Sequence, residues 1–194
     1  MTRRGLPAGD YDYEAQGEGY AARRRADSRI AALVHAALGE ARTVVNVGAG
    51  AGSYEPSDRT VLAVEPSARM RSQRSVGGLP AVDATAERLP FDDEAFDAAM
   101  ATVTVHQWTD VIAGLRELRR VPAGPVVVLT FDGEQLDRLW LGDYFPELFV
   151  AERRRYPSLE FIGQVLGGTV SVHLRTQTTF VGSLRLLVAQ PTQT

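Results

Sequence analysis

Three glycines at alternate positions, Gly48, Gly50 and Gly52, follow directly on the β-branched run 43–47. Glycine has no Cβ, so its backbone adopts positive φ angles and lets a ligand lie directly against the chain. The run itself, Thr-Val-Val-Asn-Val, predicts a buried strand. A buried strand that ends in such a loop, with a helix to follow, is how α/β sheets hold nucleotide-like cofactors. The expected chemistry is therefore that of a bound nucleotide-like cofactor.

An acid at the end of the next predicted strand, 58–66, fits the same interpretation. Glu65 lies 17 residues after Gly48, near the distance at which this architecture brings a carboxylate to the ribose hydroxyls of a nucleoside. A carboxylate there accepts two hydrogen bonds and sets the orientation of the ligand. The alternative is a solvated acid at a strand end; the glycine loop upstream favours the ribose role.

The spacing of the glycines narrows the kind of cofactor. A dinucleotide fold carries Gly-x-Gly-x-x-Gly, whereas here the third glycine comes one residue early, at Gly52. The chain has no lysine, which excludes a P-loop lysine and a Schiff-base lysine. The cofactor therefore needs a nucleoside pocket more than a pyrophosphate pocket.

Alternating strands and helices must position these residues. Strands are expected at 43–47, 58–66, 81–84, 96–105 and 126–131, with amphipathic helices at 28–38, 67–70 and 111–121. This alternation predicts a parallel sheet with helices on both faces. Residues 169–175 and 180–184 alternate and predict an antiparallel hairpin at one edge. The predicted fold is α/β: a Rossmann-like, doubly wound, mostly parallel seven-stranded sheet with a C-terminal antiparallel hairpin.

Length and composition bound the function classes. We expect one domain over residues 1–194, with 1–25 as either a frayed terminus or a lid carrying Tyr11, Tyr13 and Tyr20. A net charge of −3 disfavours a nucleic-acid partner. The chain has no cysteine, and no run is apolar enough for a membrane span or a signal peptide. We expect a cytoplasmic protein with no membrane partner; the oligomeric state is not indicated.

Four segments occur in an order that is typical of one family. They are 45–52 (Val-Asn-Val-Gly-Ala-Gly-Ala-Gly), 64–70 (Val-Glu-Pro-Ser-Ala-Arg-Met), 86–97 (Ala-Glu-Arg-Leu-Pro-Phe-Asp-Asp-Glu-Ala-Phe-Asp) and 101–108 (Ala-Thr-Val-Thr-Val-His-Gln-Trp). With them, the chain resembles the class I S-adenosylmethionine-dependent methyltransferases, most of all the small-molecule branch called type 11.

The resemblance implies S-adenosyl-L-methionine as cofactor, S-adenosyl-L-homocysteine as its product, and no metal. It implies methyl transfer to the O, N or C atom of a small-molecule substrate. The alternative is a protein of the same fold that binds the cofactor without transferring methyl, as a regulatory partner or a non-methylating enzyme. The implied cofactor-binding residues are Asn46, Gly48, Ala49, Gly50, Gly52, Glu65, Pro66, Met70, Thr85, Ala86, Glu87, Ala101 and Thr102.

The chain departs from the family pattern at three positions. Asn46 stands where the first motif usually has an acid, which normally helps to hold the amino end of the ligand. Gln107 stands where a second histidine is common, and Thr85 replaces a usual aspartate, although Asp83 is close by. The region expected to cover the substrate, 133–167, is short for this branch. These departures affect details of binding rather than the cofactor itself.

Two residues are candidates for proton transfer in the reaction. His106 follows the strand at 96–105 and has a near-neutral pKa that suits a base; the alternative is a structural or substrate-positioning role. Asp132, just past the strand at 126–131, is a second candidate acid, base or substrate anchor. Four aromatic residues are candidates to line an apolar substrate pocket, with core packing as the alternative: Trp108, Phe131, Trp140 and Tyr144.

Overall fold

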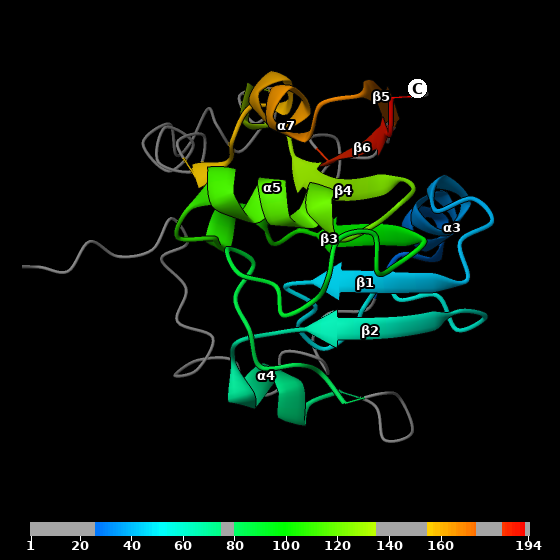
Figure 1. Ribbon diagram of the computed structural model, residues 1–194, viewed down its shortest axis with the longest axis vertical. Helices are drawn as coiled ribbons and strands as arrows, with labels where there is room; N and C mark the ends of the chain where they lie inside the picture. Colours follow the sequence, from blue (N-terminus) through cyan, green and yellow to red (C-terminus); the bar gives the residue numbers. More distant parts are fainter. Residues whose placement is uncertain (1–25, 75–79, 135–154, 174–183, 193–194) are drawn as a thin grey trace, which may run out of the picture.

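A computed structural model describes residues 26–74, 80–134, 155–173 and 184–192. They form a six-stranded sheet in the order β2-β1-β3-β4-β6-β5 (Figure 1). The strands β1 (Thr43–Val47), β2 (Thr60–Val64), β3 (Ala98–Thr102) and β4 (Val126–Phe131) are parallel. The strands β5 (Thr169–His173) and β6 (Leu184–Gln190) run antiparallel at one edge. The predicted α/β sheet with a C-terminal antiparallel pair is confirmed.

Helices cover both faces of the sheet. The helix α3 (Ser28–Ala37) is capped by Asp27 and packs Ile30 and Val34 in one apolar cluster with residues of β1, β3 and β4. On the other face, α5 (Val111–Arg120) and α7 (Leu159–Leu166) pack in a second cluster. The short helix α4 (Ala68–Ser72) follows β2 and is capped by Ser67. The parallel strands thus lie between two apolar layers, as buried parallel strands require.

A seventh strand is not found among the described residues. At the expected position, 81–84, there is one isolated parallel bridge between Val64 and Val82. Val82 donates to the carbonyl of Ala63 at 2.8 Å and accepts from the N–H of Glu65 at 3.0 Å. The ladder ends there because the N–H of Ala84 donates back to Val82 and Pro80, two residues before Val82, has no N–H to donate.

No helix lies between the glycine loop and β2. Residues 48–59 join β1 to β2 through turns alone. Their sequence explains this, because three glycines and Pro56 disfavour a helix. Tyr54 packs against the apolar cluster beneath α3. The connection is therefore compact, and the polar side chains within it lie close to the end of β1.

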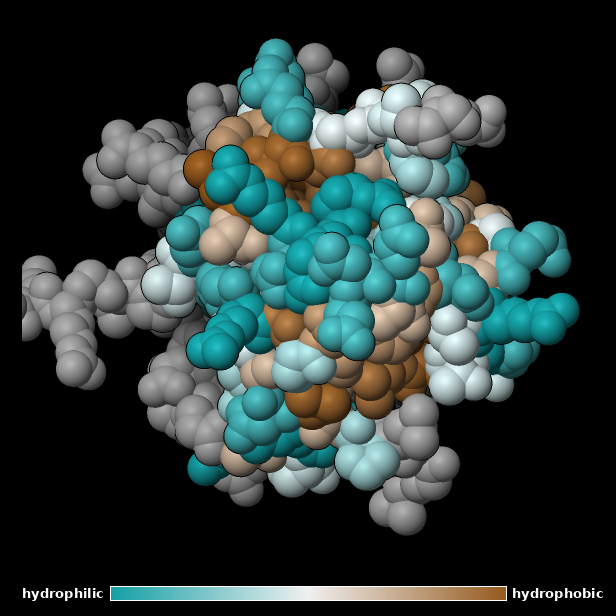
Figure 2. All heavy atoms as spheres, viewed as in Figure 1, coloured by the Kyte–Doolittle hydropathy of each residue, from teal (hydrophilic) through white to brown (hydrophobic). Residues whose placement is uncertain are grey.

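The helix α5 is amphipathic, and helical spacing predicts that Ile112, Leu115, Leu118 and Val121 share its buried face. Leu115, Leu118 and Val121 are buried as expected, whereas Ile112 is 41% exposed. Figure 2 shows hydrophilic side chains gathered over α5 on this face of the molecule. Trp108 lies against the helix at Gly114, where a Cβ would fall 2.5 Å from the indole ring. Trp108 is therefore a core residue and does not line a substrate pocket.

The last two strands are described over part of their expected ranges, because residues 174–183 lie outside the described residues. Strand β6 extends beyond the expected limit of Leu184 to Gln190, and five of its seven residues are buried. Residues 184–189 of this strand pair with β4, which explains their burial. Trp140, Tyr144 and the 1–25 segment lie outside the described residues. Within the described ranges, no helix has the length and apolar character needed to span a membrane.

Candidate functional site

The glycine loop lies at the carboxyl end of β1, and each glycine has a different neighbour. All three adopt positive φ, at 68°, 52° and 86°. A Cβ at Gly48 would clash with the side chain of Thr104, and one at Gly52 would lie 2.8 Å from the carboxylate of Glu55. At Gly50 a Cβ would meet only the terminal methyl of Met70, at 3.3 Å. Gly50 is therefore the glycine against which the protein itself packs least tightly.

Glu65 joins the end of β2 to this loop. Its Oε2 accepts from the N–H of Gly50 at 2.8 Å, and its Oε1 accepts from the N–H of Ser67 at 2.9 Å. The residue is 8% exposed. Each carboxylate oxygen accepts more than one hydrogen bond, so these contacts leave capacity for two ligand hydroxyls. Glu65 thus lies beside the loop with its carboxylate already oriented.

Asn46 belongs to a polar network under the loop. Its Nδ2 donates to Glu55 Oε1 at 2.9 Å, and Arg74 Nη2 donates to Glu55 Oε2 at 2.6 Å. Arg74 Nη1 reaches the carbonyl of Gly50 at 3.3 Å. The Oδ1 of Asn46 is buried and accepts no hydrogen bond from the described part of the chain. A buried oxygen without a donor is costly, which makes this atom a candidate ligand contact.

Pro66 follows Glu65 in the chain, and Met70 lies on α4 with its terminal methyl near Gly50. Met70 is buried on α4, while Pro66 is exposed. Arg71 holds this corner, because its Nη1 donates to the carbonyls of Glu65 and Pro66 at 2.7 and 2.9 Å. Its Nη2 donates to Asp83 Oδ2 at 2.9 Å. Arg71 therefore connects the strand end at Glu65 to the segment that leads toward residue 85.

The segment 85–87 is anchored to the loop that precedes α5. Glu87 Oε1 accepts from the N–H groups of Thr109 and Asp110 at 2.8 and 3.2 Å. Thr85 is exposed, whereas Ala86 is buried in the cluster beneath α5. The Glu87 carboxylate thus positions the chain after β3. Ala101 is also fully buried in that cluster, and Thr102 ends β3 half-buried.

An ion pair on α5 holds the rest of this segment. Glu117 Oε2 accepts from the N–H of Leu89 at 2.9 Å, and both of its oxygens accept from Arg120. Arg120 also donates to the carbonyl of Phe91 and to Asp93, each at 2.8 Å. The hydrogen bonds from Arg120, opposed in part by burial, lower the pKa of Glu117. The carboxylate form of Glu117 therefore stabilises this arrangement.

His106 lies in the single-turn 3-10 helix η1 (Val105–Gln107) that follows β3. The residue is 5% exposed. Its ring lies 4.7 Å from that of Tyr156, which lies 5.3 Å from the ring of Phe131, both measured between centroids. Phe131 ends β4. The structure thus brings His106 and Phe131 together through Tyr156, at the carboxyl ends of β3 and β4.

Asp132 is tied to the antiparallel edge of the sheet. Its Oδ2 lies 3.6 Å from Nε of Arg185 on β6, and both side chains are largely buried. Its Oδ1 accepts from the N–H of Glu134 at 3.1 Å. Asp132 therefore has a clear structural role at the end of β4, next to Phe131.

The turn between β3 and η1 has an unusual backbone. Val103 adopts a φ of 55°, which is uncommon for a β-branched residue and is found most often at functional sites. Its N–H donates to the carbonyl of Leu129 at 2.7 Å, which fixes the turn to β4. The turn places the side chain of Thr104 against Gly48. The strained turn thus connects the glycine loop to the segment that carries His106.

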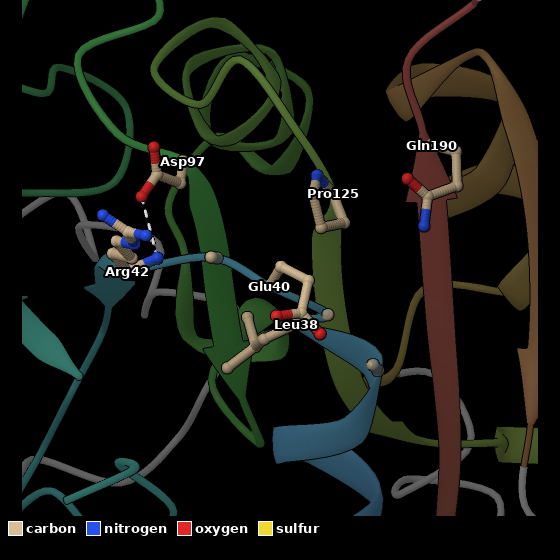
Figure 3. Close-up of a pocket in the computed structure, with 9 residues that line it drawn as sticks. Leu38, Glu40, Arg42, Asp97, Pro125 and Gln190 are labelled. Atoms are coloured by element: carbon tan, nitrogen blue, oxygen red, sulfur yellow. Dashed lines mark hydrogen bonds between the residues drawn. The ribbon is translucent and has the colours of Figure 1, made fainter. Parts of the chain in front are cut away.

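A cavity of about 630 Å³ lies at the amino ends of the parallel strands, among Leu38, Arg42, Asp97, Pro125 and Gln190 (Figure 3). It contains none of the expected site residues. Asp97 Oδ2 accepts from the N–H groups of Arg42 and Thr43, each at 2.8 Å. These bonds, that from Thr43 first, lower the pKa of Asp97. Asp97 therefore joins β1 to β3 and is not part of the glycine-loop site.

Four residues of the site were not predicted: Glu55, Arg74, Thr104 and Tyr156. Glu55 lies only three residues after Gly52, and in a connection without a helix this spacing returns it to the end of β1. The spacing therefore indicates the position of Glu55 only when the connection between β1 and β2 is known to contain no helix. Arg74 and Tyr156 come from distant segments, and only the folded chain brings them to the site.

Residues 45–128 match the family model described as "Methyltransferase domain". The chain is 46% identical over 55 residues to the demethylmenaquinone methyltransferase of Mycolicibacterium gilvum, an alignment that covers 27% of this chain and 24% of the relative. The chain spans less than two fifths of the length of the curated relatives it matches.

Two solved structures extend the comparison beyond the matched segment. A protein of Anabaena variabilis, described as a methyltransferase candidate from an antibiotic biosynthesis pathway, has a TM-score of 0.69 and 28% identity. That alignment covers 77% of this chain and 65% of the other. An S-adenosylmethionine-dependent methyltransferase of Thermotoga maritima has a TM-score of 0.71 and 22% identity, over 92% of this chain and 97% of the other. At that identity the second likeness shows the fold.

Proposed function

Because residues 45–128 belong to the class I S-adenosylmethionine-dependent methyltransferases, type 11 branch, we propose that this protein transfers a methyl group from S-adenosylmethionine to a small molecule. The observation that carries the proposal is the contact between the glycine loop and the strand-end acid, Gly50 N–H to Glu65 Oε2 at 2.8 Å. It creates one binding edge from the ends of β1 and β2. The relatives that are named for quinone methylation favour a small-molecule acceptor.

The residues at this edge fit the cofactor. Glu65 has lone pairs left to accept the two ribose hydroxyls, and Gly50 offers backbone without a side chain in the way. Asn46 Oδ1 is a buried acceptor without a donor among the described residues, as a ligand with an ammonium group would require. We further propose that Pro66, Met70 and Thr85 lie along the nucleoside. Three other predicted residues shape the neighbouring backbone instead: Ala86, Glu87 and Ala101.

Methyl transfer depends more on correct positioning of the acceptor than on activation of the methyl group. Bound S-adenosylmethionine supplies a sulfonium methyl group that is already reactive. The protein then orients the acceptor in line with that group and excludes water. His106, Tyr156 and Phe131 form an aromatic cluster of rings tilted against one another at the carboxyl ends of β3 and β4. His106 is suited to accept a proton from a hydroxyl or amine of the acceptor, and Asp132 supports this cluster through its pairing with Arg185.

The experiment that tests this function is a methyl-transfer assay with labelled S-adenosylmethionine. The purified full chain is incubated with a panel of phenols, quinols, amines and carbon acids. Labelled product together with S-adenosylhomocysteine supports the proposal. Binding of both cofactor forms with no transfer to any acceptor supports the alternative, a protein of this fold that binds the cofactor without methylating. Absence of binding contradicts both.

We expect the protein to act as a cytoplasmic enzyme that needs neither a metal nor a nucleic-acid partner. The net charge of −3 supports the latter, because it offers no general attraction for a polyanion. Addition of a chelator to the transfer assay tests the metal expectation, with an unchanged rate as the expected result.

A further inference from the structure

The carboxamide of Asn46 is held in one orientation by Glu55. Nδ2 of Asn46 lies 2.9 Å from Glu55 Oε1, and an ionised carboxylate only accepts hydrogen bonds, so the NH₂ group must face it. Asn46 Oδ1 then faces elsewhere. The residue is 1% exposed, and this oxygen accepts no hydrogen bond from the residues that the structure describes. The protein thus keeps a buried acceptor available at the end of β1.

The orientation of Glu55 is itself fixed by Arg74. Arg74 Nη2 donates to Glu55 Oε2 at 2.6 Å, and the two side chains are 13% and 17% exposed. One carboxylate oxygen is therefore committed to Arg74 and the other to Asn46. The pair lies directly against Gly52, where a Cβ would come within 2.8 Å of Glu55 Oε2. Gly52 accordingly makes room for the ion pair rather than for a ligand.

We propose that Glu55 is a positioning residue that keeps Asn46 Oδ1 as the acceptor for the α-ammonium group of bound S-adenosylmethionine. This inference rests on the proposed function. An amide that donates to a carboxylate becomes a better acceptor at its own oxygen. Among the donors of the cofactor, the α-ammonium is the cationic one, so it gains most from such an acceptor. The acid of the family's first motif is thus replaced by an amide with a carboxylate behind it.

A single substitution, Glu55→Gln, should reverse the orientation of the Asn46 carboxamide. The introduced glutamine would have one acceptor oxygen, and the charged Arg74 would take it, because hydrogen bonds to charged groups are the stronger ones. The NH₂ group of the glutamine would then face Asn46, and two NH₂ groups cannot bond to each other. Asn46 would turn its Oδ1 toward residue 55 and present its NH₂ group to the cofactor. In Glu55→Gln, the site would therefore repel the ammonium group it is built to accept.

The family's usual acid should also be harmful here when it is introduced alone. Asn46→Asp would place a carboxylate against that of Glu55, and like charges at this separation repel. The combination Asn46→Asp with Glu55→Gln should restore the site. In that double variant the glutamine NH₂ group donates to one oxygen of the introduced aspartate, and the other oxygen remains an acceptor for the ammonium group.

The test is calorimetric binding of two ligands by the full-length chain. S-adenosylhomocysteine carries the amino-acid end, whereas 5′-methylthioadenosine lacks it. We expect both single variants to bind S-adenosylhomocysteine roughly 10-fold more weakly. In Glu55→Gln the hydrogen bond to the ammonium group is lost, and in Asn46→Asp repulsion from Glu55 displaces the acceptor. Their affinity for 5′-methylthioadenosine should stay within about two-fold of wild type, and the double variant should recover most of the loss. Glu160→Gln on α7, remote from the loop in sequence, is the control and should match wild type.

Two results would overturn the inference while the proposed function stands. In one, Glu55→Gln binds S-adenosylhomocysteine as tightly as wild type. In the other, it loses affinity for both ligands equally, as expected of a residue that only supports the loop. A wild-type protein that binds neither ligand would instead contradict the proposed function, and this inference with it. Retained binding of 5′-methylthioadenosine also shows that a variant is folded.

Discussion

Glu65 accepts a hydrogen bond from the backbone N–H of Gly50 at 2.8 Å, so the acid at the end of β2 and the loop at the end of β1 are joined before any ligand binds. The bond fixes the middle of the loop, where Gly50 has a φ of 52°. A pre-oriented carboxylate reduces the ordering cost that binding would otherwise incur. Cofactor affinity should therefore depend on both residues.

Gly50→Val should abolish binding of S-adenosylhomocysteine. The new side chain would occupy the space beside Met70 and disfavour the positive φ that the loop requires. Gly39→Val provides the control, because the φ of Gly39 is 58° and nothing lies within 4 Å of a Cβ placed there. Both variants should lose about 1–2 kcal/mol of stability from the left-handed backbone. Only Gly50→Val should lose the ligand in calorimetry, and equal affinities in the two variants would remove the loop from the site.

Glu65→Ala should weaken binding of S-adenosylhomocysteine by about 1.5–3 kcal/mol, the range for hydrogen bonds to a charged group. The loss combines the ribose contact with the released N–H of Gly50. Asp58→Ala, at the other end of β2, is the matched control, since it removes a carboxylate that is 73% exposed and paired with Arg59. That change should have little effect on affinity. Unchanged affinity in Glu65→Ala would show that this carboxylate does not contact the ribose.

His106→Ala should lower turnover far more than cofactor affinity. If His106 accepts the proton of the acceptor, the loss in kcat should be roughly 10²–10⁴-fold, with the affinity for S-adenosylhomocysteine unchanged. His173→Ala, on the edge strand β5, should retain the wild-type rate. Steady-state kinetics with the first acceptor that shows activity provide the measurement. A near-normal rate in His106→Ala would leave this residue with a purely structural role.

Stability should fall at acid pH in part through Glu117. Its pKa is lower in the folded chain because Arg120 donates to it. The resulting stabilisation is fully present above the ordinary glutamate pKa and is lost as the pH falls through the lowered value. Denaturant unfolding at about pH 7 and about pH 3 should show a smaller pH effect in Glu117→Gln than in wild type. Equal pH effects in the two proteins would mean that Glu117 contributes no such linkage.

Much of this architecture could be predicted because the apolar pattern of the chain is strong. The β-branched runs of β1 and β4 and the caps at Asp27, Ser67 and Asp110 are local signals, and each marks an observed element. Ile112 was misplaced because helical periodicity gives the buried face only to within one residue. The prediction of a strand at 81–84 was wrong because a run of four residues does not reveal how many hydrogen bonds it forms with the neighbouring strand; only one bridge forms there.

The site could be predicted only in part, for a different reason. The role of the glycines and of Glu65 is indicated by residue type and spacing alone, so it can be predicted from the sequence. The network of Asn46, Glu55 and Arg74 depends on a connection between β1 and β2 that has no helix, and on an arginine 19 residues after Glu55. No local pattern encodes such a contact. The aromatic contact of His106 with Tyr156 likewise joins segments that only folding brings together.

The most direct test of the central claim is a calorimetric titration of the wild-type chain with S-adenosylhomocysteine. We expect a single site per chain with affinity in the micromolar range and no comparable binding of a nicotinamide dinucleotide. The early third glycine argues for that selectivity. No measurable binding of S-adenosylhomocysteine, or tighter binding of the dinucleotide, would contradict the proposed cofactor and the function built on it.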